Sequence, residues 1–369
     1  MELAATLALM QFAVSLLVST VVTRRMRGRP VPWIAVPASA LIPAAILALV
    51  TLLDGIPMLS LATGAGLATF GLLGCACGVA TGLRGQPRWN LRRSWGVSAA
   101  VMLVAAEIAA LAAWWGHPVG WVLAFLLMGR AFARFSILAH EAAHRLLFSN
   151  RRANDLIGIS LLGWIPWGSG THDYRRVHQA HHRDEFGPNE PDFLLYSLYP
   201  ITRASFRRKL RRDALGVSAW RQVRPAFRGL VSPGERGTAI RFLGMQAAIL
   251  TGFVVVGKPW LWLFLWFLPY FTWYQILNRL RALAEHAGMT RSADRRETTH
   301  IVRPSLWSRL FLAPSHVGYH LPHHVDSGIP MRNLPRLQEI LIEDGYVPDH
   351  LVWPSYVALW RACVTGRAD

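Results

Sequence analysis

Seven apolar stretches constrain the fold of this 369-residue chain more than any other feature. About 20 helical residues cross the hydrocarbon core of a bilayer, and a run of that length without charges is typical of a membrane span. Hydrophobic residues make up 53% of the chain. We therefore predict an all-α, polytopic membrane protein with seven transmembrane helices, at residues 3–22, 33–53, 58–82, 96–115, 119–139, 240–256 and 260–278.

The distribution of arginine orients the predicted helices. Segments 23–32 and 83–95 hold four arginines each, whereas the three short turns between paired spans hold a single lysine. Because cytoplasmic loops are enriched in Lys and Arg, the arginine-rich segments are predicted to be cytoplasmic. Segments 140–239 and 279–345 then lie on the same side and would form a helical cytoplasmic cap.

The formal net charge of +18 has a simple explanation in a membrane protein. The arginines flank apolar spans, where they would contact anionic lipid headgroups. No basic stretch has the pattern of a nucleic-acid-binding module, so we expect no nucleic-acid partner. The three cysteines are too few for a disulfide framework or a thiolate cluster. The predicted location is a bacterial-type inner membrane, crossed several times.

Three histidine clusters stand out against this background. Two share the spacing H-x-x-H-H and the third is an i, i+4 pair; their members are His178, His181, His182, His320, His323, His324, His140 and His144. If each H-x-x-H-H segment is helical, its three side chains lie on one face, so we expect its three imidazoles to converge on one point. The predicted topology places all three clusters on the cytoplasmic face.

The number of clustered histidines indicates metal binding. Neutral imidazole is a strong ligand for iron, zinc, copper and nickel. A structural zinc ion needs four ligands, so eight histidines are too many for one ion. Two metal ions, each with a position left for substrate or oxygen, fit the count better.

Two other functions compete with this interpretation. Residues His140 to His144 read His-Glu-Ala-Ala-His, which matches the zinc protease pattern in which the glutamate, here Glu141, is the general base. An intramembrane metalloprotease would leave both H-x-x-H-H clusters without a role. A metal transporter would hold its ligands near the middle of the membrane, whereas these clusters lie at the ends of the predicted spans.

The three clusters resemble the histidine boxes of the membrane fatty acid desaturase superfamily. The similarity extends to Leu147-Phe148-Ser149-Asn150, Tyr174-Arg175-Arg176 and Pro191-Asp192-Phe193, and covers about residues 95–345. It implies an O₂-dependent membrane lipid desaturase with a non-haem di-iron centre, acting on a fatty acyl or sphingolipid-like substrate. It also implies an external electron donor of the ferredoxin, rubredoxin or cytochrome b5 type. A lipid hydroxylase, or a carotenoid hydroxylase or ketolase, remains an alternative within the superfamily.

The resemblance also implies further site residues. His286, in Glu285-His286-Ala287-Gly288, matches a ninth histidine ligand in related enzymes. Ligand imidazoles usually donate their second N–H to a carboxylate or carbonyl, and Asp192 and Glu285 are the expected acceptors. No catalytic side chain is expected beyond the metal centre itself.

The resemblance suggests a division of the chain into three parts. We predict a three-helix membrane extension at 1–90, a desaturase-like catalytic core at 91–345 and a cytoplasmic tail at 346–369. Within the core, the predicted membrane hairpins are 96–139 and 240–278, and the cytoplasmic segments are 140–239 and 279–345.

Overall fold

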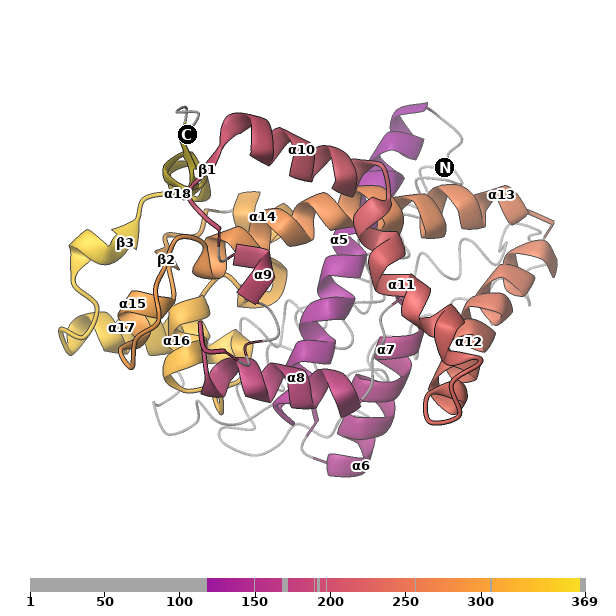
Figure 1. Cartoon of the computed structure of the whole chain (residues 1–369), viewed down its shortest axis with the longest axis horizontal. Helices are drawn as coiled ribbons and strands as arrows, with labels where there is room; N and C mark the ends of the chain where they lie inside the picture. Colours follow the sequence, from indigo (N-terminus) through magenta and orange to yellow (C-terminus); the bar gives the residue numbers. More distant parts are fainter. Residues whose placement is uncertain are drawn as a thin grey trace, which may run out of the picture. The chain divides into compact units, whose positions relative to one another are not determined.

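The computed structural model describes residues 118–365, except residues 149, 168–171, 189, 191–192, 197, 256 and 306. Over this range the chain is mainly helical (Figure 1), and its strands form two short two-stranded sheets. The predicted predominance of helix is confirmed. Four predicted spans (3–22, 33–53, 58–82 and 96–115) lie outside the described residues.

The first helices carry two of the histidine clusters. Helix α5 (Pro118–Ala143) has His140 in its last turn, and α8 (His172–Arg183) carries the cluster at 178–182. Three short helical segments follow one another between them: α6 (Arg151–Ala153), the π-helical η2 (Asn154–Leu161) and α7 (Leu162–Trp164). The side chain of Asn150 starts this run, because it accepts hydrogen bonds from the backbone N–H groups of Arg152 and Ala153.

The middle of the chain is a series of helices, two of which are separated by a turn at Gly216. Its elements are α9 (Phe193–Tyr196), β1 (Ile201–Thr202), α10 (Arg203–Ala214), α11 (Val217–Gly229) and α12 (Arg236–Val255). Thr202 caps α10 by accepting from the backbone N–H of Ser205. Gly216 has φ +76°, a left-handed conformation that lets the chain reverse between α10 and α11.

A long helical stretch then leads to the ninth histidine. It comprises α13 (Pro259–Trp262), the π-helical η3 (Leu263–Phe267) and η4 (Tyr270–Tyr274), and α14 (Gln275–His286). Pro259 lies in the first turn, where its missing N–H costs no helical hydrogen bond. His286 is the last residue of α14, so this stretch delivers its imidazole to the region of the other clusters.

The C-terminal part of the described chain consists of short elements around α14. They are α15 (Arg295–Thr298), β2 (Ile301–Val302), η5 (Ser308–Leu312), η6 (Pro314–His316), α16 (His320–Val325), η7 (Met331–Asn333), α17 (Leu334–Glu343), η8 (Asp349–Leu351), β3 (Val352–Trp353), α18 (Tyr356–Cys363) and β4 (Val364–Thr365).

Two parallel strand pairs attach the last of these elements to the rest of the fold. Ile201 of β1 pairs with Val364 of β4, and Ile301 of β2 pairs with Val352 of β3. The indole N–H of Trp360 in α18 also donates to the carbonyl of Leu280 in α14, at 3.0 Å. The segment from β3 to β4 therefore packs against the same core as α14.

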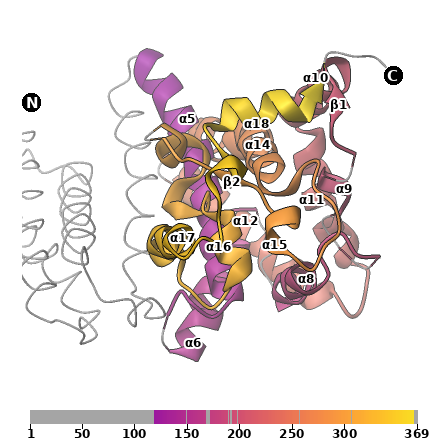
Figure 2. The same cartoon turned by 90° about the vertical axis from the view of Figure 1, so that its left-hand side faces the viewer.

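Side chains from widely separated elements form the main apolar core. Ile137 of α5, Leu283 of α14 and Leu359 of α18 are at most 2% exposed and belong to one buried cluster. In both views α8, α16 and the lower end of α5 lie side by side (Figures 1 and 2), and these three elements carry the histidine clusters.

Two helices among the described residues are long and apolar enough to cross a membrane, judged by length and composition. They are α5 and α12, which coincide with the predicted spans 119–139 and 240–256. The predicted span 260–278 is helical as well, but π-helical turns divide it.

Candidate metal centre

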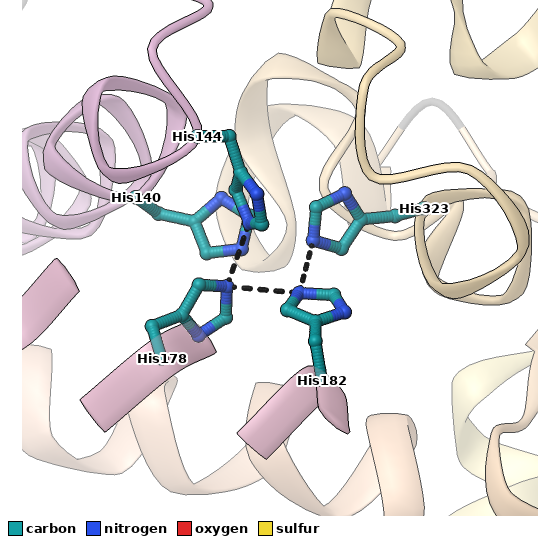
Figure 3. A group of neighbouring side chains, drawn as sticks. All are labelled: His140, His144, His178, His182 and His323. Carbon is teal, nitrogen blue, oxygen red and sulfur yellow. Dashed lines mark hydrogen bonds between the residues drawn. The ribbon is translucent and has the colours of Figure 1, made fainter. Parts of the chain in front are cut away.

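All nine predicted histidines gather in two groups of nitrogen atoms. Within each group the candidate ligand atoms lie within 4.8 Å of one another. The first group has five members and the second has four. The first consists of His140, His144, His178, His182 and His323, and the second of His181, His286, His320 and His324. Figure 3 shows the five rings of the first group pointing toward a common centre.

The structure corrects the expectation that each H-x-x-H-H segment converges on a single point. In α8, His178 and His182 join the first group and His181 joins the second. In α16 the arrangement is reversed, because His320 and His324 join the second group and His323 joins the first. Successive helical residues are about 100° apart around the axis. The i, i+4 pair therefore faces one centre while the remaining histidine faces the other.

The nitrogen spacing in the first group is that of ligands around a metal ion. Nε2 of His178 lies 2.9 Å from Nε2 of His144 and 3.0 Å from Nε2 of His182, and Nε2 of His182 lies 3.0 Å from Nε2 of His323. An imidazole nitrogen carries either one proton or one in-plane lone pair, so it is a poor hydrogen-bond partner for two other ring nitrogens. Two imidazoles bound at right angles to one metal ion would have nitrogens about 2.9 Å apart.

The second group has the same spacing. Nε2 of His320 lies 3.0 Å from Nε2 of His286 and 3.0 Å from Nε2 of His324. Nδ1 of His286 lies 2.8 Å from the carbonyl oxygen of Thr298. Because a carbonyl can only accept, Nδ1 of His286 carries the proton and its Nε2 presents a lone pair.

Carboxylates fix two more imidazoles of the second group. Nδ1 of His181 lies 2.8 Å from Oε1 of Glu190, and Nδ1 of His324 contacts Oε1 of Glu185. Both glutamates are buried. If ionised, each accepts an N–H and directs the lone pair on Nε2 toward the group. Three lone pairs that converge without a cation would repel one another, so this donor set fits a bound metal ion.

The sequence predicted Asp192 and Glu285 as the hydrogen-bond acceptors of ligand imidazoles. Asp192 lies outside the described residues. Oε1 of Glu285 is 3.7 Å from Nδ1 of His320 and accepts from Arg281 at 2.6 Å. Glu185 was not singled out from the sequence. Acidic residues follow the second box at several positions, and only the folded chain shows which of them reaches α16.

Burial keeps the imidazoles neutral. It lowers the pKa of His178, His286, His320, His323 and His324 well below the usual value, and repulsion from neighbouring imidazoles lowers it further. Burial also lowers the pKa of His144 to about 4. The neutral form is the one that binds metal ions, so the folded chain holds these side chains ready as ligands near neutral pH.

Glu141, which would be the general base of a zinc protease, is hydrogen-bonded to the backbone in this structure. Its carboxylate accepts a hydrogen bond from the backbone N–H of Met331, at 3.0 Å for Oε1. It thereby ties α5 to the segment that follows the third histidine cluster. His140 and His144 also share their group with three further histidines, which exceeds the ligand set of that protease site.

A cavity of about 210 Å³ lies next to the first group. Its wall includes Ala139, which directly precedes His140, and Tyr174, whose ring stacks on His178 with centroids 5.6 Å apart. The rest of the lining is mainly aromatic and aliphatic, with Phe132, Leu162, Trp167, Tyr270 and Tyr274. An apolar molecule in this cavity would lie beside the first histidine group.

Comparison with known proteins identifies the family. Residues 117–356 match the family model for fatty acid desaturases, and the chain belongs to this family. A dihydrorhizobitoxine desaturase from Bradyrhizobium elkanii is 27% identical over 272 residues, which cover 68% of this chain and 76% of the relative. The protein is therefore an oxidoreductase of the desaturase type.

Two further relatives are named for lipid substrates. An sn-1 acyl-lipid omega-3 desaturase (ferredoxin) from Nostoc sp. (strain 36) is 21% identical over 300 residues, covering 71% of this chain and 78% of the relative. An sn-1 oleoyl-lipid 12-desaturase from Anabaena variabilis is 23% identical over 295 residues, covering 70% and 79%. No solved structure matches the chain significantly.

Proposed function

We propose that this enzyme is an O₂-dependent membrane lipid desaturase whose two iron ions are held by the nine histidines. The observation that carries the proposal is the division of nine buried or half-buried imidazoles into groups of five and four nitrogens. Iron is among the metals that imidazole binds well. The family membership favours iron over the other candidates.

The protein residues have distinct tasks in this proposal. The iron pair, when bound, would supply the reduction of O₂ and the removal of hydrogen from an unactivated C–H bond. Glu185, Glu190 and the carbonyl of Thr298 hold protons on the Nδ1 atoms of their histidine partners. This leaves Nε2 of each as the ligand atom and fixes the orientation of the ring.

The cavity beside the first group is the proposed binding site for the reacting part of a fatty acyl or sphingolipid-like chain. Its aromatic and aliphatic lining would exclude water from the reacting carbons. Tyr174 would position these carbons, because it lines the cavity and its ring stacks on His178. Ala139 lines the same cavity and directly precedes His140 in the chain. One relative is named an acyl-lipid desaturase and another an oleoyl-lipid desaturase, which supports a lipid substrate.

The proposal also includes the arrangement of the chain in the membrane. We propose a multi-pass protein of a bacterial-type inner membrane with seven spans and the metal centre on the cytoplasmic face. The three-part division at 1–90, 91–345 and 346–369 remains a prediction. Helices α10 and α11 expose Arg207, Arg224 and Trp220. Basic and aromatic side chains together are typical of a helix that contacts anionic lipid headgroups.

An external protein would supply electrons for the reduction of O₂. We propose a donor of the ferredoxin, rubredoxin or cytochrome b5 type. Two relatives carry ferredoxin in their names, which supports a small iron–sulfur protein. A strongly basic chain, with a net charge of +18, would attract an acidic donor by long-range electrostatics.

Expression in a host of defined lipid composition tests the reaction. Mass spectrometry of the extracted lipids should show a product that has lost two hydrogen atoms. A product that has instead gained one oxygen atom would contradict desaturation and favour the hydroxylase or ketolase alternative. Products should be absent for a His181→Ala or a His323→Ala variant, because each change removes a ligand from a different group.

Metal analysis of the purified protein tests the centre. We expect about two iron ions per chain in the wild type, since each group would hold one ion. A single zinc ion together with peptidase activity would contradict the di-iron proposal. Normal turnover by either histidine variant would contradict the ligand assignment.

A further inference from the structure

One buried arginine connects the helices that carry the first histidine group. Arg175 lies on α8, nearly one turn before His178, and is 7% exposed. Its Nε donates to the carbonyl oxygen of Ala143 at 3.1 Å, and its Nη2 donates to the carbonyl oxygen of Ala142 at 3.0 Å. An arginine is seldom buried to this degree unless it is paired.

The two carbonyls lie at the C-terminal end of α5, next to the first histidine cluster. Ala142 and Ala143 lie between His140 and His144 and form the end of the helix. The last carbonyls of a helix lack their regular partners and carry partial negative charge; among backbone groups, the N–H of Arg145 donates to the carbonyl of Ala142 at 3.0 Å. The planar guanidinium of Arg175 can satisfy two neighbouring carbonyls at once and adds a positive charge at this end.

Segment η2 also contacts Ala142 and Arg175. Asn154 donates from Nδ2 to the carbonyl of Ala142 at 2.9 Å, and Asp155 accepts from Nη2 of Arg175 through Oδ1. A Cβ atom on Gly158 would lie 2.4 Å from Cβ of Ala142, so η2 approaches α5 as closely as only a glycine permits. The ends of α5, η2 and α8 therefore meet around Ala142.

We propose that Arg175 is a positioning residue for the first metal group. It fixes the end of α5 against α8 and so sets His140 and His144 against His178 and His182. This inference rests on the proposed metal centre. The second group depends on other contacts, those of Glu185, Glu190 and Thr298 with its histidines.

Because Arg175 contacts the end of α5, its loss is predicted to affect the first metal group and not the second. None of the four histidines in the second group lies on α5. If Arg175 is lost, the angle between α5 and α8 is no longer fixed, and the nitrogens of the first group no longer share one centre. The protein should then retain one metal ion in the second group.

Metal content of the purified full-length protein tests this prediction. Each variant is reconstituted with Fe²⁺, and separately with Co²⁺ for its visible spectrum, and metal per chain is measured by mass spectrometry. The metal content of the Arg175→Met variant should fall from about two ions per chain to about one. Arg175→Lys should lose the same ion, because lysine keeps the charge but lacks the forked geometry. Arg176→Met is the matched control, since Arg176 is an exposed neighbour and should keep both ions.

Double variants identify which ion is lost. Adding His144→Ala to Arg175→Met should cause no further loss, whereas adding His286→Ala should remove the remaining ion. Retention of both ions by both folded Arg175 variants would overturn the inference. So would equal loss in the control, or loss of both ions from either folded Arg175 variant; circular dichroism and gel filtration establish folding. A wild-type protein that binds no metal would overturn the proposed centre itself, and with it this inference.

Discussion

Nδ1 of His181 and Oε1 of Glu190 lie 2.8 Å apart, and the side chain of each is at most 5% exposed. The buried carboxylate fixes the ring and makes Nε2 a better donor to a metal ion. Glu190 also accepts from the backbone N–H of Phe186 at 3.3 Å, so the turn after α8 holds it in place. In the proposed di-iron centre, this contact would make Glu190 a determinant of the second metal position.

Glu190→Gln should weaken metal binding at the second group. The amide keeps the shape but loses the charge, and loss of such a partner typically lowers metal affinity about 10-fold to 100-fold. Competition with a chelator of known affinity measures the change. Asp184→Asn is the matched control, because Asp184 is paired with Arg291 on the surface. Unchanged affinity in Glu190→Gln would show that the contact does not influence the metal.

Glu185→Ala should destabilise the protein more than Glu285→Ala does. The Glu185 side chain is fully buried and contacts both His324 and Arg295. The Glu285 side chain is 11% exposed and pairs with Arg281, one turn earlier on the same helix, which is itself 21% exposed. Removal of one partner from a buried ion pair costs about 3 kcal/mol. Thermal unfolding of the metal-free variants compares the two changes. A lower Tm for Glu285→Ala would contradict the order predicted here.

Ala139→Leu should reduce turnover without removing metal. The larger side chain would fill part of the cavity that Ala139 lines and displace the reacting carbons. We expect at least about a tenfold fall in turnover, since a displacement of 1 Å can cost about 100-fold. Product formation and iron content are measured on the same preparation. The control is Ala204→Leu on the exposed face of α10, which should leave both values unchanged.

Acid should destabilise the metal-free protein. The folded-state pKa values of the site histidines lie below the value of 6.5 for an unfolded chain, that of His144 at about 4. Below about pH 6.5 the unfolded chain therefore takes up protons that the folded chain does not, and stability falls. Tm measured with a chelator present should fall between about pH 7 and pH 5. A Tm that is constant or rises over this interval would contradict the prediction.

Local sequence patterns were sufficient to predict some of the helices. The apolar runs at 119–139 and 240–256 correspond to α5 and α12, because helical length and composition are local properties. The same holds for the clusters at 178–182 and 320–324, whose helical spacing is fixed by the chain itself. His286 was different. A lone histidine has no periodic signal, and the resemblance to the desaturase superfamily identified it.

The assignment of histidines to the two groups could not be predicted from spacing. An H-x-x-H-H segment is the same in α8 and in α16, yet the i, i+4 pair faces the first group in one helix and the second group in the other. The difference depends on how each helix is rotated about its axis, and packing against the rest of the protein sets that rotation. For the same reason, the sequence could not show which acids reach which imidazoles: Glu185 contacts His324, Glu190 contacts His181, and Glu285 lies 3.7 Å from His320.

The sequence by itself determined that the described part of this chain is mainly helical, and that eight of the nine expected ligand histidines are clustered at helical spacing. These properties depend on the hydrophobicity and the spacing of neighbouring residues. The tertiary structure alone decided that the nine form groups of five and four, and that Arg175 bonds the end of α5. Contacts between residues more than 30 positions apart are set by the packing of whole helices, which no local pattern contains.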